Sequence, residues 1–172
     1  MVKPIFVTLC IVVLVAVYSH KIHPEIFHEK INRSDEIIVY KNKRILSLRN
    51  KGRHIKSYSI SLGGNPLGHK EQEGDGRTPE GNYIIDWIHP NSSYHKAMRL
   101  SYPNFIDEDN AEQMGVSPGS NIMIHGLPNG MGWLYPLLSK RDWTNGCIAV
   151  SNSAIEEITS SVSIGTKITI EP

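Results

Sequence analysis

Cysteine is scarce in this chain, and its scarcity limits what the protein can be. Only Cys10 and Cys147 occur in 172 residues, too few for the several bridges that hold disulfide-rich domains together. An excess of charge is also lacking, because 18 Lys and Arg oppose 17 Asp and Glu for a net charge of +1. A broad basic surface for nucleic acid needs more positive charge than this. The composition therefore excludes a disulfide scaffold and predicts no nucleic-acid partner.

The chain also lacks an apolar run of the ~20 residues that a membrane-spanning helix needs. Its longest apolar segment, Ile5–Val17, has 13 residues and follows Lys3. A positive charge before a short apolar run is typical of an export signal. We therefore expect residues 1–19 to be a signal peptide or an N-terminal anchor. If uncleaved, residues 5–17 would tether the protein to a membrane, and either way it would be exported to the periplasm or cell envelope.

Removal of residues 1–19 would leave a neutral domain with one thiol. Lys3 is the only charged residue in that segment, so 17 basic and 17 acidic side chains remain. An exported protein whose single cysteine is Cys147 has no intramolecular disulfide, which points to a reactive or intermolecular thiol. Residues 20–35 are polar and aperiodic, which predicts a linker, and their histidines lack partners at metal-binding spacing. The main domain then spans residues 36–171.

Strand patterns dominate this domain. Short β-branched or apolar runs bounded by turn residues are typical of a small β-rich fold. We expect strands at residues 37–40, 45–48, 57–62, 83–88, 122–124, 148–150 and 167–170. One short helix is expected at 107–114, closed by Gly115, and another from Asn152 or Ser153 to Gly165. The pattern predicts a mainly β domain with short helices (α+β).

A glycine-rich loop follows the third expected strand and invites comparison with a phosphate-binding loop. Gly63 and Gly68 have the required spacing, but His69 stands where the lysine belongs. No Ser or Thr follows Lys70, so the hydroxyl that would bind Mg²⁺ is also missing. The loop is therefore not a nucleotide site.

One histidine and one cysteine occupy positions suited to nucleophilic catalysis. His125 ends the expected strand 122–124, and Cys147 follows Gly146 just before the strand 148–150. A thiol becomes a good nucleophile as the thiolate, and a neighbouring imidazole can take its proton. A thiolate paired in this way would form well below the pKa of ~8.5 of a free cysteine. A structural histidine and an inert buried thiol are the alternative interpretations.

The turn before Cys147 also suits acyl transfer. Gly146 permits a tight turn, in which the backbone N–H groups of Asn145, Gly146 and Cys147 would converge on one point. Convergent N–H donors stabilise the oxyanion of a tetrahedral intermediate. The sequence thus predicts a nucleophile and an oxyanion hole within a few residues.

Residues 124–126 (Ile-His-Gly) and 144–148 (Thr-Asn-Gly-Cys-Ile) resemble the active-site signature of the L,D-transpeptidase (YkuD) family. In that family a His-Gly pair precedes a Ser/Thr-x-Gly-Cys motif. Residues 74–83 (Gly-Asp-Gly-Arg-Thr-Pro-Glu-Gly-Asn-Tyr) look like the family's Thr-Pro-x-Gly-x-Tyr turn, and the likeness covers residues 36–170 in matching order. The residues around the histidine and cysteine look like the YafK branch. The resemblance implies one catalytic domain with a mixed β-sandwich or barrel fold.

The family resemblance implies a role for each motif residue. Cys147 would be the nucleophile, His125 its base, and the Gly126 carbonyl would orient the imidazole. Thr144 would hold the turn, and the N–H groups of Asn145 and its neighbours would form the oxyanion hole. The substrate would be a peptidoglycan stem peptide, cut between a diamino acid and D-alanine through a thioester. An amine would resolve the thioester in transpeptidation, or water in L,D-carboxypeptidase or endopeptidase hydrolysis, with no cofactor or metal.

Two positions depart from the family pattern. Asn145 replaces a histidine, and Ala149 stands where many members have an arginine. If that arginine binds a substrate carboxylate, then Arg141, Lys140 or Arg77 must replace it. The departures also keep open an inactive wall-binding module, which would have the cleft without the chemistry.

Other cysteine enzymes fit less well. A sortase-like enzyme also has histidine before cysteine, but it needs Thr-x-x-Thr-Cys and a later arginine, and no arginine follows Cys147. A papain-like order is excluded because no histidine follows Cys147 either. Trp133, Tyr135 and Trp143 lie between base and nucleophile, where they either line the cleft or pack under a loop.

Overall fold

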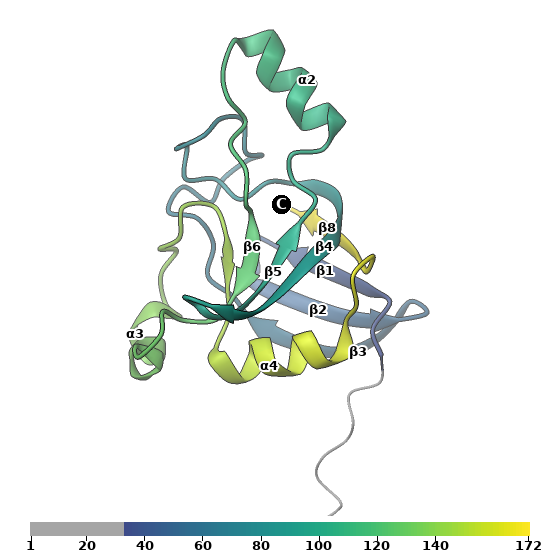
Figure 1. Cartoon of the computed structure of the whole chain (residues 1–172), viewed down its shortest axis with the longest axis vertical. Helices are drawn as coiled ribbons and strands as arrows, with labels where there is room; N and C mark the ends of the chain where they lie inside the picture. Colours follow the sequence, from purple (N-terminus) through teal and green to yellow (C-terminus); the bar gives the residue numbers. More distant parts are fainter. Residues whose placement is uncertain (1–32) are drawn as a thin grey trace, which may run out of the picture. The chain divides into compact units, whose positions relative to one another are not determined.

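A mixed sheet of eight strands dominates the computed structural model, which describes residues 33–172 (Figure 1). The strands are β1 (Glu36–Tyr40), β2 (Ile45–Asn50), β3 (Arg53–Ser59), β4 (Gly81–Ser92), β5 (His95–Leu100), β6 (Met123–His125), β7 (Ile148–Ala149) and β8 (Lys167–Glu171). They lie in the order β3-β2-β1-β8-β4-β5-β6-β7. β1 with β8 and β6 with β7 run parallel, and the other neighbours run antiparallel. The mainly β class expected from the sequence is confirmed.

The chain just beyond β3 joins the two ends of this sheet. Ser61 pairs with Ala149 of β7, the strand at the opposite end. The Ser61 N–H donates to the Ala149 carbonyl at 2.9 Å, and the Ala149 N–H donates back to Ser61 at 2.8 Å. Gly63 forms a further bridge to Thr144. The sheet therefore closes on itself, as the expectation of a mixed sandwich or barrel required.

The core enclosed by the sheet is mainly aliphatic. Ile37 and Val39 of β1 are fully buried, as are Leu46 and Leu48 of β2, because alternate side chains of a strand point to one face. Helix α4 (Asn152–Ser161) adds two further buried isoleucines to the same cluster. Burial of one such side chain stabilises the fold by about 1.5–3 kcal/mol.

Side-chain caps determine where the two longer helices begin. Asn104 and Asp107 form a capping box at the start of α2 (Phe105–Met114), and Gly115 ends this helix at φ 68°. The Ser151 hydroxyl accepts a backbone N–H from the first turn of α4. Two short elements complete the described helices, η2 (Gly132–Leu134) and α3 (Tyr135–Leu138). Among residues 33–172, no helix is long and apolar enough to cross a membrane.

Three features of the chain differ from the sequence predictions. The strand expected at 57–62 divides at Ser59, after which the chain leaves β2 and pairs with β7. β5 was not predicted, because polar and apolar residues do not alternate regularly along it. α4 ends at Ser161 rather than continuing to Gly165. The predicted residues 1–19 and most of the linker 20–35 lie outside the described part of the chain.

A glycine substitution tests the joint between the two sheet ends. A Cβ atom on Gly63 would lie 2.1 Å from the Gly76 carbonyl oxygen and 2.9 Å from Gly146 Cα, whereas one on Gly64 would meet its nearest atom at 4.0 Å. We expect Gly63→Ala to lower the free energy of unfolding by about 1–3 kcal/mol or more. The matched control Gly64→Ala should stay within about 0.5 kcal/mol of the parent. Urea denaturation of both variants measures this difference. Equal stabilities would contradict the close approach of Gly63 to Gly76 and Gly146.

Candidate active site

Parallel pairing of β6 with β7 brings the predicted base and nucleophile onto one face of the sheet. Ile124 pairs with Ile148, and His125 pairs with Ala149. Both isoleucines are fully buried. Because side chains alternate along a strand, His125 and Cys147 lie together on the opposite face. Residues 22 positions apart in the chain thus become diagonal neighbours.

The ring of His125 is held in one tautomer. Its Nδ1 lies 2.7 Å from the Gly126 carbonyl oxygen, which can only accept a hydrogen bond. Nδ1 therefore carries the hydrogen, and Nε2 of the neutral ring is free to accept a proton. Burial lowers the pKa of His125, and the hydrogen bond to Gly126 offsets part of this effect. The imidazole is a neutral potential base at pH 7.

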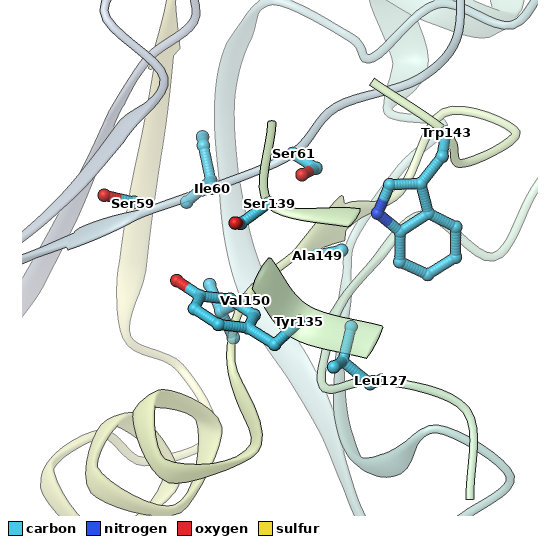
Figure 2. A pocket seen from close by; sticks show the side chains of 9 residues that line it. All are labelled: Ser59, Ile60, Ser61, Leu127, Tyr135, Ser139, Trp143, Ala149 and Val150. Carbon is cyan, nitrogen blue, oxygen red and sulfur yellow. The ribbon is translucent and has the colours of Figure 1, made fainter. Parts of the chain in front are cut away.

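Two aromatic rings enclose this imidazole. The ring of Tyr94 lies 4.6 Å from that of His125, and Trp143 lies 5.9 Å away in an edge-on arrangement. Of the three aromatics expected near the site, Trp143 contacts the base, whereas Trp133 is 76% exposed. Tyr135 instead lines a small hollow with Trp143 and Ala149 (Figure 2). Tyr94 was missed because it lies in the turn between β4 and β5, far from both motifs in sequence.

Thr144 organises the turn that leads to Cys147. Its hydroxyl donates to the Cys147 carbonyl at 2.7 Å and accepts the Gly146 N–H at 3.2 Å. The Gly146 N–H, one of the three donors predicted for the oxyanion hole, is therefore used within the turn. The N–H groups of Asn145 and Cys147 remain as donors for an oxyanion.

Glycine is the residue type that fits position 146 in this turn. Its φ is +118°, which L side chains rarely adopt. A Cβ atom here would also lie 2.6 Å from the Arg77 carbonyl oxygen. The glycine-rich loop before β4 thus presses directly against the nucleophile turn.

The thiol of Cys147 is protonated in this environment. Its Sγ lies 3.6 Å from the Asn121 carbonyl oxygen, which accepts the S–H. Burial raises the pKa of Cys147, while a backbone hydrogen bond from Met123 and the charge of Lys70 oppose the rise. Burial therefore opposes the preformed thiolate expected from the sequence, and alkylation against pH tests that expectation. A neutral thiol faces the same side of the sheet as the neutral imidazole of His125.

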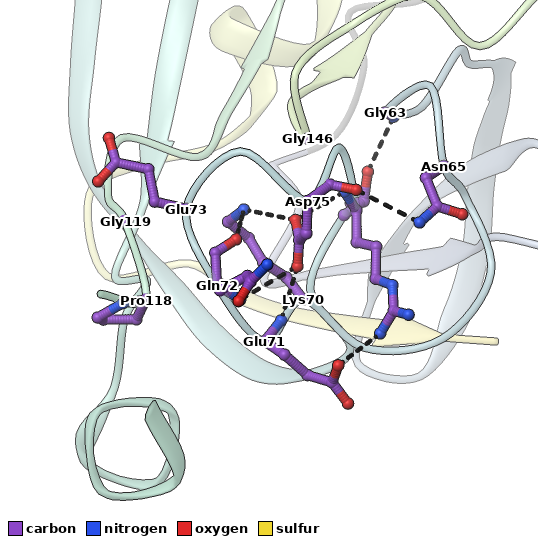
Figure 3. A network of polar contacts seen from close by, with 12 residues as sticks. Gly63, Asn65, Lys70, Glu71, Gln72, Glu73, Asp75, Pro118, Gly119 and Gly146 are labelled. Atoms are coloured by element: carbon purple, nitrogen blue, oxygen red, sulfur yellow. Dashed lines mark hydrogen bonds and ion pairs between the residues drawn. The ribbon is translucent and has the colours of Figure 1, made fainter. Parts of the chain in front are cut away.

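Lys70, which sequence reasoning did not select, is the cation that acts on the thiol. It is 3% exposed, and its ammonium donates to Asp75 at 2.8 Å and to the Gln72 carbonyl at 2.9 Å (Figure 3). The other Asp75 carboxylate oxygen accepts backbone N–H groups of the same loop, from Glu71 and Gln72. The sequence signal that could have identified Lys70 is a lysine and an aspartate five residues apart within a glycine-rich loop.

The three cations proposed to replace the missing arginine have other environments. Arg77 forms an ion pair with Glu71 at 2.8 Å. Arg141 and Lys140 are exposed beyond α3, and the Arg141 backbone N–H donates to Leu138. Ala149, at the arginine position, is 3% exposed. Within residues 33–172, no cluster of three His, Cys, Asp or Glu could hold a metal ion.

The sequence model of the YkuD family, the L,D-transpeptidase catalytic domain, matches residues 34–170. The chain therefore belongs to this family of catalytic domains. It is similar to the L,D-transpeptidase homologue YafK of Escherichia coli strain K12, with 31% identity over 128 residues, 71% of this chain and 44% of YafK. The chain thus spans less than half the length of that relative.

Two solved structures share the fold. The helical cell shape determining protein Pgp2 of Campylobacter jejuni is 25% identical with a TM-score of 0.62, covering 86% of this chain and 52% of that one. Bd1075 of Bdellovibrio bacteriovorus is 28% identical with a TM-score of 0.56, covering 84% and 50%. The family resemblance seen in the sequence is confirmed.

The pH dependence of alkylation tests the protonation of Cys147. In a Cys10→Ser chain, the rate of iodoacetamide labelling follows the thiolate fraction. Because burial raises the pKa of Cys147, we expect the midpoint to lie above the ~8.5 of a free thiol. The same chain in denaturant is the control and should show the ordinary midpoint. A folded midpoint below that of the unfolded chain would mean a resting thiolate–imidazolium pair.

Substitution of Thr144 tests how the nucleophile turn is held. Thr144→Val keeps the shape but leaves the Gly146 N–H and the Cys147 carbonyl without their hydroxyl partner. We expect a loss of about 1–3 kcal/mol in the free energy of unfolding, the cost of unpaired buried polar groups. Thr144→Ser retains the hydroxyl and should lose much less. If thermal unfolding shows that both variants lose a comparable free energy of unfolding, the Thr144 hydroxyl does not hold the turn.

Proposed function

We propose that this chain is a cysteine acyltransferase that modifies peptidoglycan stem peptides. The observation that carries the proposal is the placement of His125 and Cys147 on one face of adjacent strands, with Nδ1 of the base engaged by Gly126. Membership of the L,D-transpeptidase family supports the same chemistry. The proposed substrate bond joins the L-centre of a diamino acid to a terminal D-alanine.

The first half-reaction forms a thioester. The S–H proton of Cys147 passes to Nε2 of His125 as sulfur attacks the substrate carbonyl carbon. The resulting oxyanion accepts hydrogen bonds from the backbone N–H groups of Asn145 and Cys147. When the intermediate collapses, the C–N bond breaks, and the imidazolium returns its proton to the leaving amine of D-alanine. The Gly126 carbonyl keeps the ring oriented throughout.

The second half-reaction releases the acyl group. His125 takes a proton from an amine or a water molecule as it attacks the thioester carbonyl, and the Cys147 sulfur leaves and regains a proton. An amine acceptor gives a cross-link by L,D-transpeptidation. Water gives L,D-carboxypeptidase or endopeptidase hydrolysis. The proposal covers both outcomes because the same thioester precedes each of them.

The setting of the reaction is part of the proposal. Peptidoglycan lies outside the cytoplasmic membrane, and the apolar segment Ile5–Val17 after Lys3 is suited to export. We therefore place the protein in the periplasm or cell envelope, with residues 5–17 as a tether if they are not removed. The likeness to Pgp2, described as determining helical cell shape, extends the proposal to cell-wall organisation and cell shape.

Muropeptide mass spectrometry tests the activity. The purified chain should convert disaccharide tetrapeptides to tripeptides, or to cross-linked dimers when an amine acceptor is present. Cys147→Ala should abolish both products, and His125→Gln should slow them by about 10²–10⁴-fold through loss of the general base. Cys10→Ser is the matched control and should retain full activity. An unchanged muropeptide profile with a folded chain and intact Cys147 would instead favour the inactive wall-binding module.

A further inference from the structure

A second cavity lies among residues 69–82 and 104–110. It has a volume of about 340 Å³ and opens between the start of α2 and the residues that lead into β4. Glu80, Asn82, Asn104, Ile106 and Asn110 contribute to its lining. This volume falls within the ~300–1,000 Å³ typical of small-molecule sites.

One wall of the cavity is rigid because its polar groups are already paired. Asp107 is 5% exposed, and its carboxylate lies 3.1 Å from His69 Nε2 and accepts the Tyr83 hydroxyl at 3.2 Å. The Asn104 N–H donates to its second oxygen at 2.9 Å. Hydrogen bonding to Asp107 raises the pKa of His69, which favours a charge-paired wall.

Other polar groups of the lining are unused. The side-chain oxygen of Asn104 caps α2, and that of Asn82 accepts the Thr169 hydroxyl at 2.9 Å. The Nδ2 groups of both residues, and the whole amide of Asn110, have no partner within residues 33–172. One carboxylate oxygen of Glu80 binds the Lys41 ammonium at 2.8 Å. Its other oxygen has no hydrogen-bond partner among the described residues.

The free groups define the chemistry of a ligand. Three amides offer N–H donors, and Glu80 offers one acceptor. Ile106 adds an apolar surface, since it is 66% exposed. The Lys41–Glu80 pair carries no net charge, and neither does the His69–Asp107 pair when His69 is protonated. The lining therefore suits a neutral ligand that has several hydroxyl and carbonyl oxygens and an apolar face.

We propose that this cavity binds an N-acetylated amino sugar of a glycan strand. Sugar hydroxyl and acetamido oxygens would accept from Asn82, Asn104 and Asn110, a sugar hydroxyl would donate to Glu80, and an apolar sugar face would contact Ile106. The inference rests on the proposed function, because the stem peptides of peptidoglycan are attached to such sugars. His69 lines the cavity, and the next residue, Lys70, acts on the Cys147 thiol. A bound sugar would thus lie on the loop that contacts the nucleophile turn.

Calorimetric titration with tri-N-acetylchitotriose tests this site without any turnover, in a Cys147→Ala chain. Asn110→Ala should weaken binding about three- to tenfold, the loss of one or two hydrogen bonds. Asn104→Ser keeps a side-chain oxygen for the helix cap but removes the free amide, and should weaken binding similarly. The matched control on the same helix is Gln113→Ala, whose side chain binds Asp109 instead and which should leave affinity unchanged.

Three results would overturn the inference. They are an absence of chitotriose binding, binding that neither Asn110→Ala nor Asn104→Ser weakens, and binding of a sugar-free stem tetrapeptide with the same dependence on these variants. If the parent chain binds the sugar but does not convert muropeptides, the result would count against the proposed function and not against the sugar site.

Discussion

The pairing of residues 61–64 with the segment that carries Cys147 is the contact on which the rest of the structure depends. Backbone hydrogen bonds join Ser61 to Ala149, and Leu62 and Gly64 to Thr144. They connect the two ends of the sheet, so neither end strand presents a free edge along this stretch. The aliphatic core is enclosed as a result. The same bonds fix the turn before Cys147, so closure of the fold and geometry of the site have one origin.

Close backbone contact between residues 61–64 and the turn before Cys147 requires glycine at two positions. Gly63 and Gly146 approach so closely that a Cβ atom on either would overlap a neighbouring backbone atom. Thr144 then fixes the turn internally through its hydroxyl. Backbone groups have no rotamers, so the proposed oxyanion-binding turn, which is built from them, loses no side-chain freedom when it is fixed. The departure at Asn145 leaves this turn intact, because its exposed side chain takes no part in the hydrogen bonds that hold the turn.

Burial shifts the pKa values of His125 and Cys147 in opposite directions, and both shifts favour the neutral form. It lowers the pKa of His125 and raises that of Cys147, because a low-dielectric site disfavours both the imidazolium and the thiolate. The resting pair is therefore neutral, and the base keeps a free Nε2 to receive the proton. The charge of Lys70, fixed by Asp75, limits the rise for the thiol. The reactivity of the Cys147 thiol would then depend on substrate binding.

Sequence alone determined the mainly β class, most strands, both longer helices and the motif residues His125, Gly126, Thr144 and Cys147. These follow from local rules, namely side-chain periodicity, capping and the residue types that nucleophilic catalysis needs. The sequence predicted a strand at 57–62, yet the change of partner after Ser59 depends on β7, almost 90 residues further on. Only the tertiary structure decided that switch, the contacts of Tyr94 and Lys70, and the neutral thiol. Pairing partners and desolvation are set by residues distant in the chain, so no local pattern encodes them.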